Sequence, residues 1–231
     1  SNLLAVASDE AFAEAEGGES MRQLGYAMHN LEFVVVGYTE LGDWEVADRT
    51  SRTFHDMARV RVADAPERSA LLARRTATLL RFERWQEVLG LPLPAPAYQT
   101  ARAFHHYAQG VAHAAQGRIS DARRAQRRFA SVLAEVPPDA DFRGNAAAHV
   151  LGIAGHVLDA RIAMAQGRLD AAAASLQLGI ALQDGLRYDE QPSWDFPLRE
   201  LLGTALLQGG QPVQAEAVYR ENLRRLPRHP R

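Results

Sequence analysis

Residues 196–227 read FPLRELLGTALLQGGQPVQAEAVYRENLRRLP. Apolar residues recur every three or four positions on both sides of the paired glycines Gly209 and Gly210. This spacing predicts two helices, because such residues share one face of a helix, and a glycine supplies the left-handed residue at which a helix ends. Ala215 follows the turn, and we expect it to pack closely against Gly203 of the first helix. The stretch therefore predicts a helix pair joined by a tight turn.

Similar turns recur along the chain. They are Gly42-Asp43-Trp44, Glu83-Arg84-Trp85, Gly117-Arg118-Ile119 and Gly167-Arg168-Leu169. A helix, a tight turn and a second helix, repeated at roughly 35 to 50 residues, are typical of a helical solenoid. The predicted helices cover residues 3–16, 22–41, 44–60, 66–81, 83–89, 97–116, 119–135, 143–166, 169–183, 196–208 and 212–226. We therefore expect an all-α fold with roughly 70% helix or more, well above the usual share in globular proteins.

The composition is that of an ordinary globular protein. Of 231 residues, 47% are hydrophobic, and 26 basic residues nearly balance 28 acidic ones. This balance excludes a disordered chain and a chain that binds nucleic acid through bulk positive charge. The sequence contains no cysteine, and every basic residue is an arginine, so thiolate, Schiff-base and catalytic-lysine chemistry are excluded. No stretch approaches about 18 uninterrupted apolar residues, so no membrane span is predicted.

The last helix pair carries a more specific pattern. Leu202-Gly203 is followed by Ala215, by Tyr219 four residues later and by Pro227. These residues at these offsets resemble the tetratricopeptide repeat (TPR). The resemblance implies a single TPR-like domain over residues 1–231, part of a longer array, in which antiparallel helix pairs form a right-handed superhelix. The concave surface of that superhelix is the expected binding face.

Three segments also resemble a group of bacterial TPR proteins. They are His29-Asn30-Leu31-Glu32-Phe33, residues 188–194 (YDEQPSW) and residues 197–203 (PLRELLG). That group is defined by its repeats, so the resemblance implies a non-enzymatic scaffold that binds a protein or peptide in its concave groove. The residues expected to line this groove are Tyr26, His29, Glu32, His106, Tyr188, Glu190, Trp194 and Arg199.

A second hypothesis uses the same groove. His29 and Glu32 are three apart on one predicted helix and therefore share a face. With His106 or Glu190 from across the groove they could hold a divalent metal ion, as in a metal-dependent enzyme or a small-ligand binder; a metal-free hydrogen-bonded pair is the alternative. In either case we expect them to face the cavity that residues 188–199 border. Glu190 or Arg199 would then balance their charges.

The remaining expectations concern catalysis, partners and location. The sequence has no G-x-S-x-G elbow and no glycine-rich phosphate loop, so no catalytic residue is assigned and, apart from the possible metal, no cofactor. The arginines between 118 and 128 have no interleaved aromatic residues, which single-stranded nucleic acid would require. We expect a protein or peptide partner, no nucleic acid and a cytoplasmic location. The alternative is that a signal peptide was removed before Ser1.

Overall fold

The computed structural model describes residues 4, 8 and 21–226. Within them the structure is 75% helix in 10 helices, which confirms the all-α expectation. The helix expected at 3–16 falls almost entirely outside the described residues. In the part of the chain that the structure describes, none of the helices combines the length and the apolar character needed to cross a membrane.

The helices follow the turns identified in the sequence. Their bounds are α2 Met21–Leu41, α3 Trp44–Asp64, α4 Ala73–Arg81, α5 Trp85–Gly90, α6 Gln99–Ala115, α7 Ile119–Leu133, α8 Ala147–Ala165, α9 Leu169–Asp184, α10 Leu198–Gln208 and α11 Pro212–Arg225. Four turn glycines have φ between 70° and 75°, at Gly42, Gly117, Gly167 and Gly210. A side chain rarely adopts this left-handed conformation, so these glycines end the helices before them.

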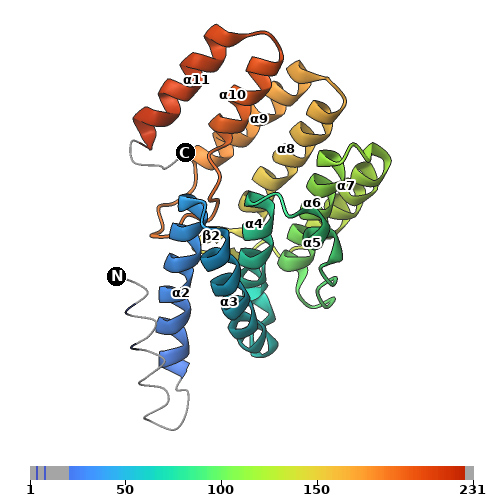
Figure 1. Ribbon diagram of the computed structural model, residues 1–231. Helices are drawn as coiled ribbons and strands as arrows, with labels where there is room; N and C mark the ends of the chain where they lie inside the picture. The colour runs from blue at the N-terminus through green and yellow to red at the C-terminus, as the bar shows by residue number, and fades with distance from the viewer. Residues whose placement is uncertain (1–3, 5–7, 9–20, 227–231) are drawn as a thin grey trace.

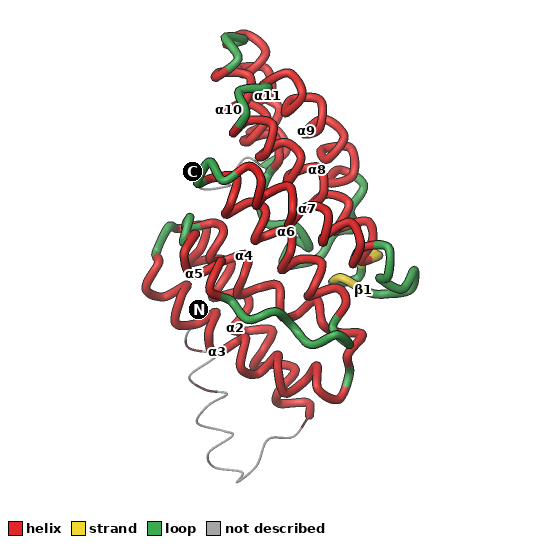
Figure 2. The backbone as a smooth tube through the Cα atoms, turned by 90° about the vertical axis from the view of Figure 1, so that its right-hand side faces the viewer, coloured by secondary structure: helices red, strands yellow, loops and turns green. Residues whose placement is uncertain are grey.

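Neighbouring helices form pairs, and the pairs stack on one another. The pairs α2/α3, α6/α7, α8/α9 and α10/α11 each pack along their length, and α6 with α8 and α9 with α10 join successive pairs. Figure 1 shows the pairs in chain order, from blue α2 through green α6 to red α11 along a curved array that brings α10 above the upper end of α2. The view turned by 90° shows α6 to α11 as successive layers (Figure 2). The fold is therefore helical-repeat-like.

Two regions differ from the sequence prediction. The helix predicted over 66–81 is a 3-10 helix, η1 (Pro66–Leu72), that leads into α4. The helix predicted over 143–166 begins later, because β1 (Asp141–Phe142) and β2 (Asn145–Ala146) form a short antiparallel hairpin. Arg143 and Gly144 both have positive φ in its two-residue turn, the geometry that matches the twist of a hairpin. Apolar periodicity could not reveal these six residues, because the turn chemistry decides them.

The main core runs from α4 to α11, and a smaller cluster joins α2 and α3 to η1. Leu151, Ile153 and Leu158 on α8 are fully buried in the main core. Trp194, which precedes α10, also belongs to it, with its ring 5.8 Å from Tyr107 and 6.5 Å from Phe104 between centroids. An aromatic side chain from an irregular segment thus completes the helical core.

Gly203 is a position where a side chain has no room. A Cβ built there would overlap the ring of Tyr219, which lies closer to it than Ala215 does. The close neighbour of Gly203 is therefore Tyr219 and not, as the sequence had led us to expect, Ala215.

We expect Gly203→Ala to lower the free energy of unfolding by about 1–3 kcal/mol, because the added methyl group overpacks this contact. Urea denaturation measures the effect. Gly37→Ala is the matched control, because nothing lies within 4 Å of its Cβ position; equal stability of the two variants would contradict this packing.

Candidate functional site

The segment between α9 and α10, residues 185–197, is here named the linking segment. It leaves the upper part of the array and descends beside α2 (Figure 1). Asn145 of β2 anchors it, because its Oδ1 accepts the Arg187 N–H at 2.9 Å and its Nδ2 donates to Ser193 Oγ at 3.0 Å. Gln183 fixes its far end by accepting the Leu198 N–H and donating to the Phe196 carbonyl, both at 3.0 Å. The hairpin and α9 therefore set the path of this segment.

Four charged side chains meet where the linking segment crosses α2 and α4. They are named the charge cluster and comprise Glu32, Arg74, Arg143 and Asp195, whose side chains are 10%, 7%, 13% and 9% exposed. Arg74 donates to Glu32 Oε1 from Nε at 3.0 Å and pairs with Asp195. Arg143 pairs with Glu32 as well. The cluster therefore joins α2, α4, the hairpin and the linking segment.

The surroundings of Arg143 show how nearby carboxylates offset the cost of burying a charged side chain. Burial lowers the pKa of Arg143, while the carboxylates of Asp195 and Asp189 oppose that shift. Its Nη2 also donates to Gln191 Oε1 at 2.9 Å. Buried charges of this kind stabilise a fold only when their partners stay in place.

The expected proximity of His29 to the linking segment is present. His29 Nε2 lies 3.5 Å from Glu190 Oε2 at the surface, and His29 and Glu32 line one open cavity of about 630 Å³ together with Asp189 and Gln191. Glu32 differs from His29 in its environment, because its carboxylate is engaged by two buried arginines. Within residues 21–226, no three histidine, aspartate or glutamate side chains are grouped as metal ligands would be.

The other predicted groove residues are distributed more widely. Tyr26 and Tyr188 are 70% and 91% exposed, whereas Trp194 is buried. His106 is buried in α6 beside His105, where burial, Arg128 and Arg102 lower its pKa. It is not among the residues that line the cavities beside Glu32. The described cavities therefore do not gather all eight residues, and their role in binding stays a prediction.

Glu190 or Arg199 was expected to balance the charges of His29 and Glu32. Glu190 lies beside His29, whereas Arg199 pairs elsewhere. Its guanidinium donates to both carboxylate oxygens of Asp184, at 2.7 Å and 2.6 Å. Asp184 is the residue that ends α9, and Arg225 of α11 lies 3.2 Å from the same carboxylate. Arg199 thus links α9 to α10. The sequence motif around Arg199 could not reveal this partner, because the contact depends on how the two helices pack.

This contact gives a pH-dependent expectation. The hydrogen bond from Arg199 lowers the pKa of Asp184 below its usual 3.8, against an opposing effect of burial. The ionised carboxylate therefore stabilises the fold above about pH 4 and loses this effect as the pH falls through the lowered pKa. We expect the unfolding free energies of wild type and Asp184→Asn to differ most near neutral pH and to converge as the pH falls through the lowered pKa of Asp184. A difference that stays constant with pH would contradict this assignment.

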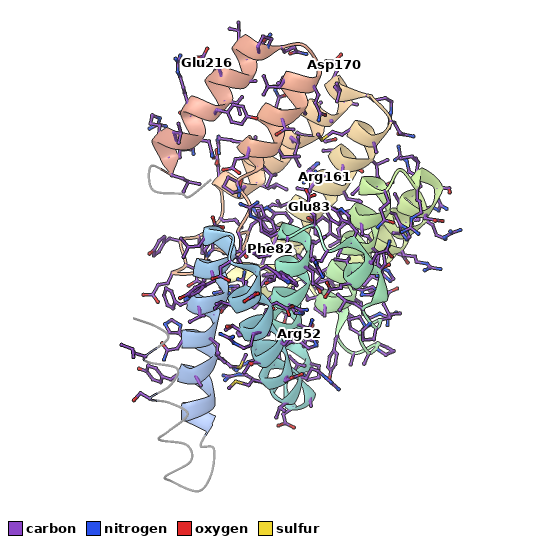
Figure 3. All side chains as sticks on the ribbon, viewed as in Figure 1. Arg52, Phe82, Glu83, Arg161, Asp170 and Glu216 are labelled. Atoms are coloured by element: carbon purple, nitrogen blue, oxygen red, sulfur yellow. The ribbon has the colours of Figure 1, made fainter. Side chains whose placement is uncertain are left out.

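A cleft of about 320 Å³, named the central cleft, lies between the lower and upper parts of the array. It is bordered by α2, α4, α5, α6, α8, α10 and the linking segment. Its walls include the aromatic side chains Trp85, Tyr107, Trp194 and Phe196. Arg161 of α8 and Glu83 of the turn after α4, both labelled in Figure 3, border the same cleft. Sequence reasoning found Trp194 in this set and missed the rest.

The central cleft has the composition of a ligand site. Such sites combine apolar and aromatic walls with a few polar groups, and their volumes begin near 300 Å³. Burial raises the pKa of Tyr107, against an opposing effect of Arg161, so its hydroxyl stays protonated at neutral pH. The cavity beside His29 is larger, but among the described residues Phe54 is the single phenylalanine, tyrosine or tryptophan that lines it. Comparison with known proteins gives no match: no family model, curated protein or solved structure matches this chain.

Proposed function

We propose that this protein is a non-enzymatic, TPR-like scaffold, a right-handed superhelix that binds a short peptide segment of a partner protein in its concave groove. The observation that carries the proposal is the central cleft, to which helices from separate pairs contribute walls. A groove lined by successive repeats is the usual binding surface of helical-repeat proteins. Aromatic side chains in such a groove act as anchors, because they offer large contact areas at little cost in conformational entropy.

The size of the cleft limits what it accepts. A volume of about 320 Å³ lies at the lower end of the range for ligand sites. The cleft therefore fits a few side chains of an extended segment, and the remainder of the partner would lie along the neighbouring helices. This favours recognition of a short linear segment over recognition of a large folded surface.

The charge cluster prepares this site for binding. It fixes Asp195 to Arg74, and the neighbours Trp194 and Phe196 form part of the cleft wall. A wall that is already in place before binding reduces the entropy lost on association. Glu32 thus supports binding indirectly: it holds Arg74, and Arg74 holds Asp195 of the linking segment. Glu32 itself does not contact the bound peptide.

Blocking the cleft tests the proposal. Thr204 is exposed at the rim of the cleft on α10, where its hydroxyl donates to the Glu200 carbonyl at 3.0 Å. The protein is immobilised, and the amount of peptide that it retains from a random hexapeptide library is measured. We expect Thr204→Trp to lower this amount by about tenfold or more, because its indole occupies the cleft. A tenfold change corresponds to about 1.4 kcal/mol.

Thr53→Trp is the matched control for this blocking variant. Thr53 is exposed on α3, its hydroxyl donates to the Arg49 carbonyl in the same way, and it does not line the central cleft. We expect this variant to retain the library like the wild type. Equal retention by Thr204→Trp and Thr53→Trp, or no retention by the wild type, would overturn the proposal.

A further inference from the structure

Two arginines in the central cleft have no ion-pair partner in the described part of the chain. Arg81 ends α4 and Arg161 lies on α8, and both border the cleft. Within residues 21–226 neither forms an ion pair, and Nε of Arg161 is buried without a hydrogen bond. Arg74, by contrast, is fully engaged by Glu32 and Asp195. A partly buried guanidinium without a carboxylate is costly unless something supplies the missing acceptor.

The acidic residues of the cleft do not supply that acceptor. Asp195 pairs with Arg74, and Glu200 accepts a hydrogen bond from Asn222 at 3.3 Å. Glu40 also has an interaction partner. Glu83 is exposed on the turn after α4, where it takes a left-handed φ of 55°. Single oxygens of Asp195 and Glu40 are buried in the described structure without a hydrogen bond, although both residues have a partner through other atoms. Among the cleft side chains with no ion pair in the described residues, two are the cations Arg81 and Arg161 and one is the exposed anion Glu83.

We propose, on the basis of the function proposed above, that the bound segment carries an acidic side chain next to an apolar or aromatic one. The carboxylate of an aspartate or glutamate accepts hydrogen bonds from the planar guanidinium of Arg161, with Arg81 adding a second positive charge. The adjacent apolar side chain packs against Trp85, Tyr107 and Phe196. The partly buried position strengthens the charge interaction, because water screens it less.

Peptide pools that differ in charge alone test this selectivity. Two hexapeptide pools with blocked ends are compared, one with aspartate or glutamate at each position in turn and one with asparagine or glutamine there. We expect full-length wild-type protein to retain the acidic pool about tenfold more strongly, and added salt to reduce this preference. Arg161→Gln and Arg81→Gln should each weaken the preference. Arg127→Gln on the exposed face of α7 should leave it unchanged.

An exposed residue gives a test that does not depend on how well a buried arginine tolerates replacement. Glu83→Gln removes the one unpartnered carboxylate described for the cleft, so we expect it to bind the acidic pool more tightly than wild type. Circular dichroism establishes that each variant is folded. Equal retention of both pools by the wild type overturns the acidic selectivity and leaves the proposed function standing. Retention of neither pool overturns the proposed function itself.

Discussion

Replacing Glu32 by glutamine is expected to lower the free energy of unfolding by about 3–5 kcal/mol. Glu32 accepts from Arg74 and pairs with Arg143, and all three side chains are buried. The change leaves these arginines facing a neutral amide in a place that water hardly reaches. Breaking a buried pair by removing one partner is costly for this reason, whereas replacing the whole pair by apolar residues often is not.

Chemical denaturation measures this effect, with Glu135→Gln as the control. Glu135 is exposed after α7, so its replacement is expected to change stability by about 0.5 kcal/mol or less. A Glu32→Gln variant as stable as this control would show that the charge cluster does not hold α2 against the linking segment.

Replacing Trp194 by alanine is expected to lower the free energy of unfolding by about 3–5 kcal/mol, the usual range for removing a large buried aromatic side chain. Trp194 is 6% exposed and packs against Phe104 and Tyr107 of α6. Its loss leaves a gap in the core and removes part of the cleft wall. We therefore expect peptide retention to fall as well.

Tyr188→Ala in the same segment is the matched control for Trp194→Ala. Tyr188 is 91% exposed, so its replacement should change stability by about 0.5 kcal/mol or less. Thermal unfolding of both variants separates the two roles. Similar melting temperatures for Trp194→Ala and Tyr188→Ala would contradict the assignment of Trp194 to the core.

The helices were predictable because periodicity and turn glycines act locally. The helix that begins at Trp44 illustrates this: Gly42 has φ of 75°, and Asp43 caps the helix by accepting the Val46 N–H. The hairpin at 141–146 was missed because its turn depends on two residues with positive φ, of which Arg143 is an unusual choice. The 3-10 helix at 66–72 was missed because it shares most of its periodicity with an α-helix.

The charge cluster was missed for a different reason. Arg74 and Glu32 are 42 positions apart, and Arg74 and Asp195 are 121 apart, so no local pattern connects them. A signal was present: residues 70–80 read ALLARRTATLL, with two arginines inside an apolar run. Arginines in such a run become buried and need carboxylate partners. His29 and Glu190 lie together as expected. That expectation was possible because the polar and aromatic residues of their two segments had marked both as candidates for one site.

The most direct test of the central cleft as the binding site is photo-crosslinking. A library peptide retained by the wild type is synthesised with a benzophenone side chain, crosslinked to the full chain and mapped by mass spectrometry. We expect crosslinks at the cleft walls, in residues 80–85, 107–111, 157–161 and 194–204. Crosslinks confined to α3, α7, α9 or α11 would place the peptide outside the central cleft and contradict the account.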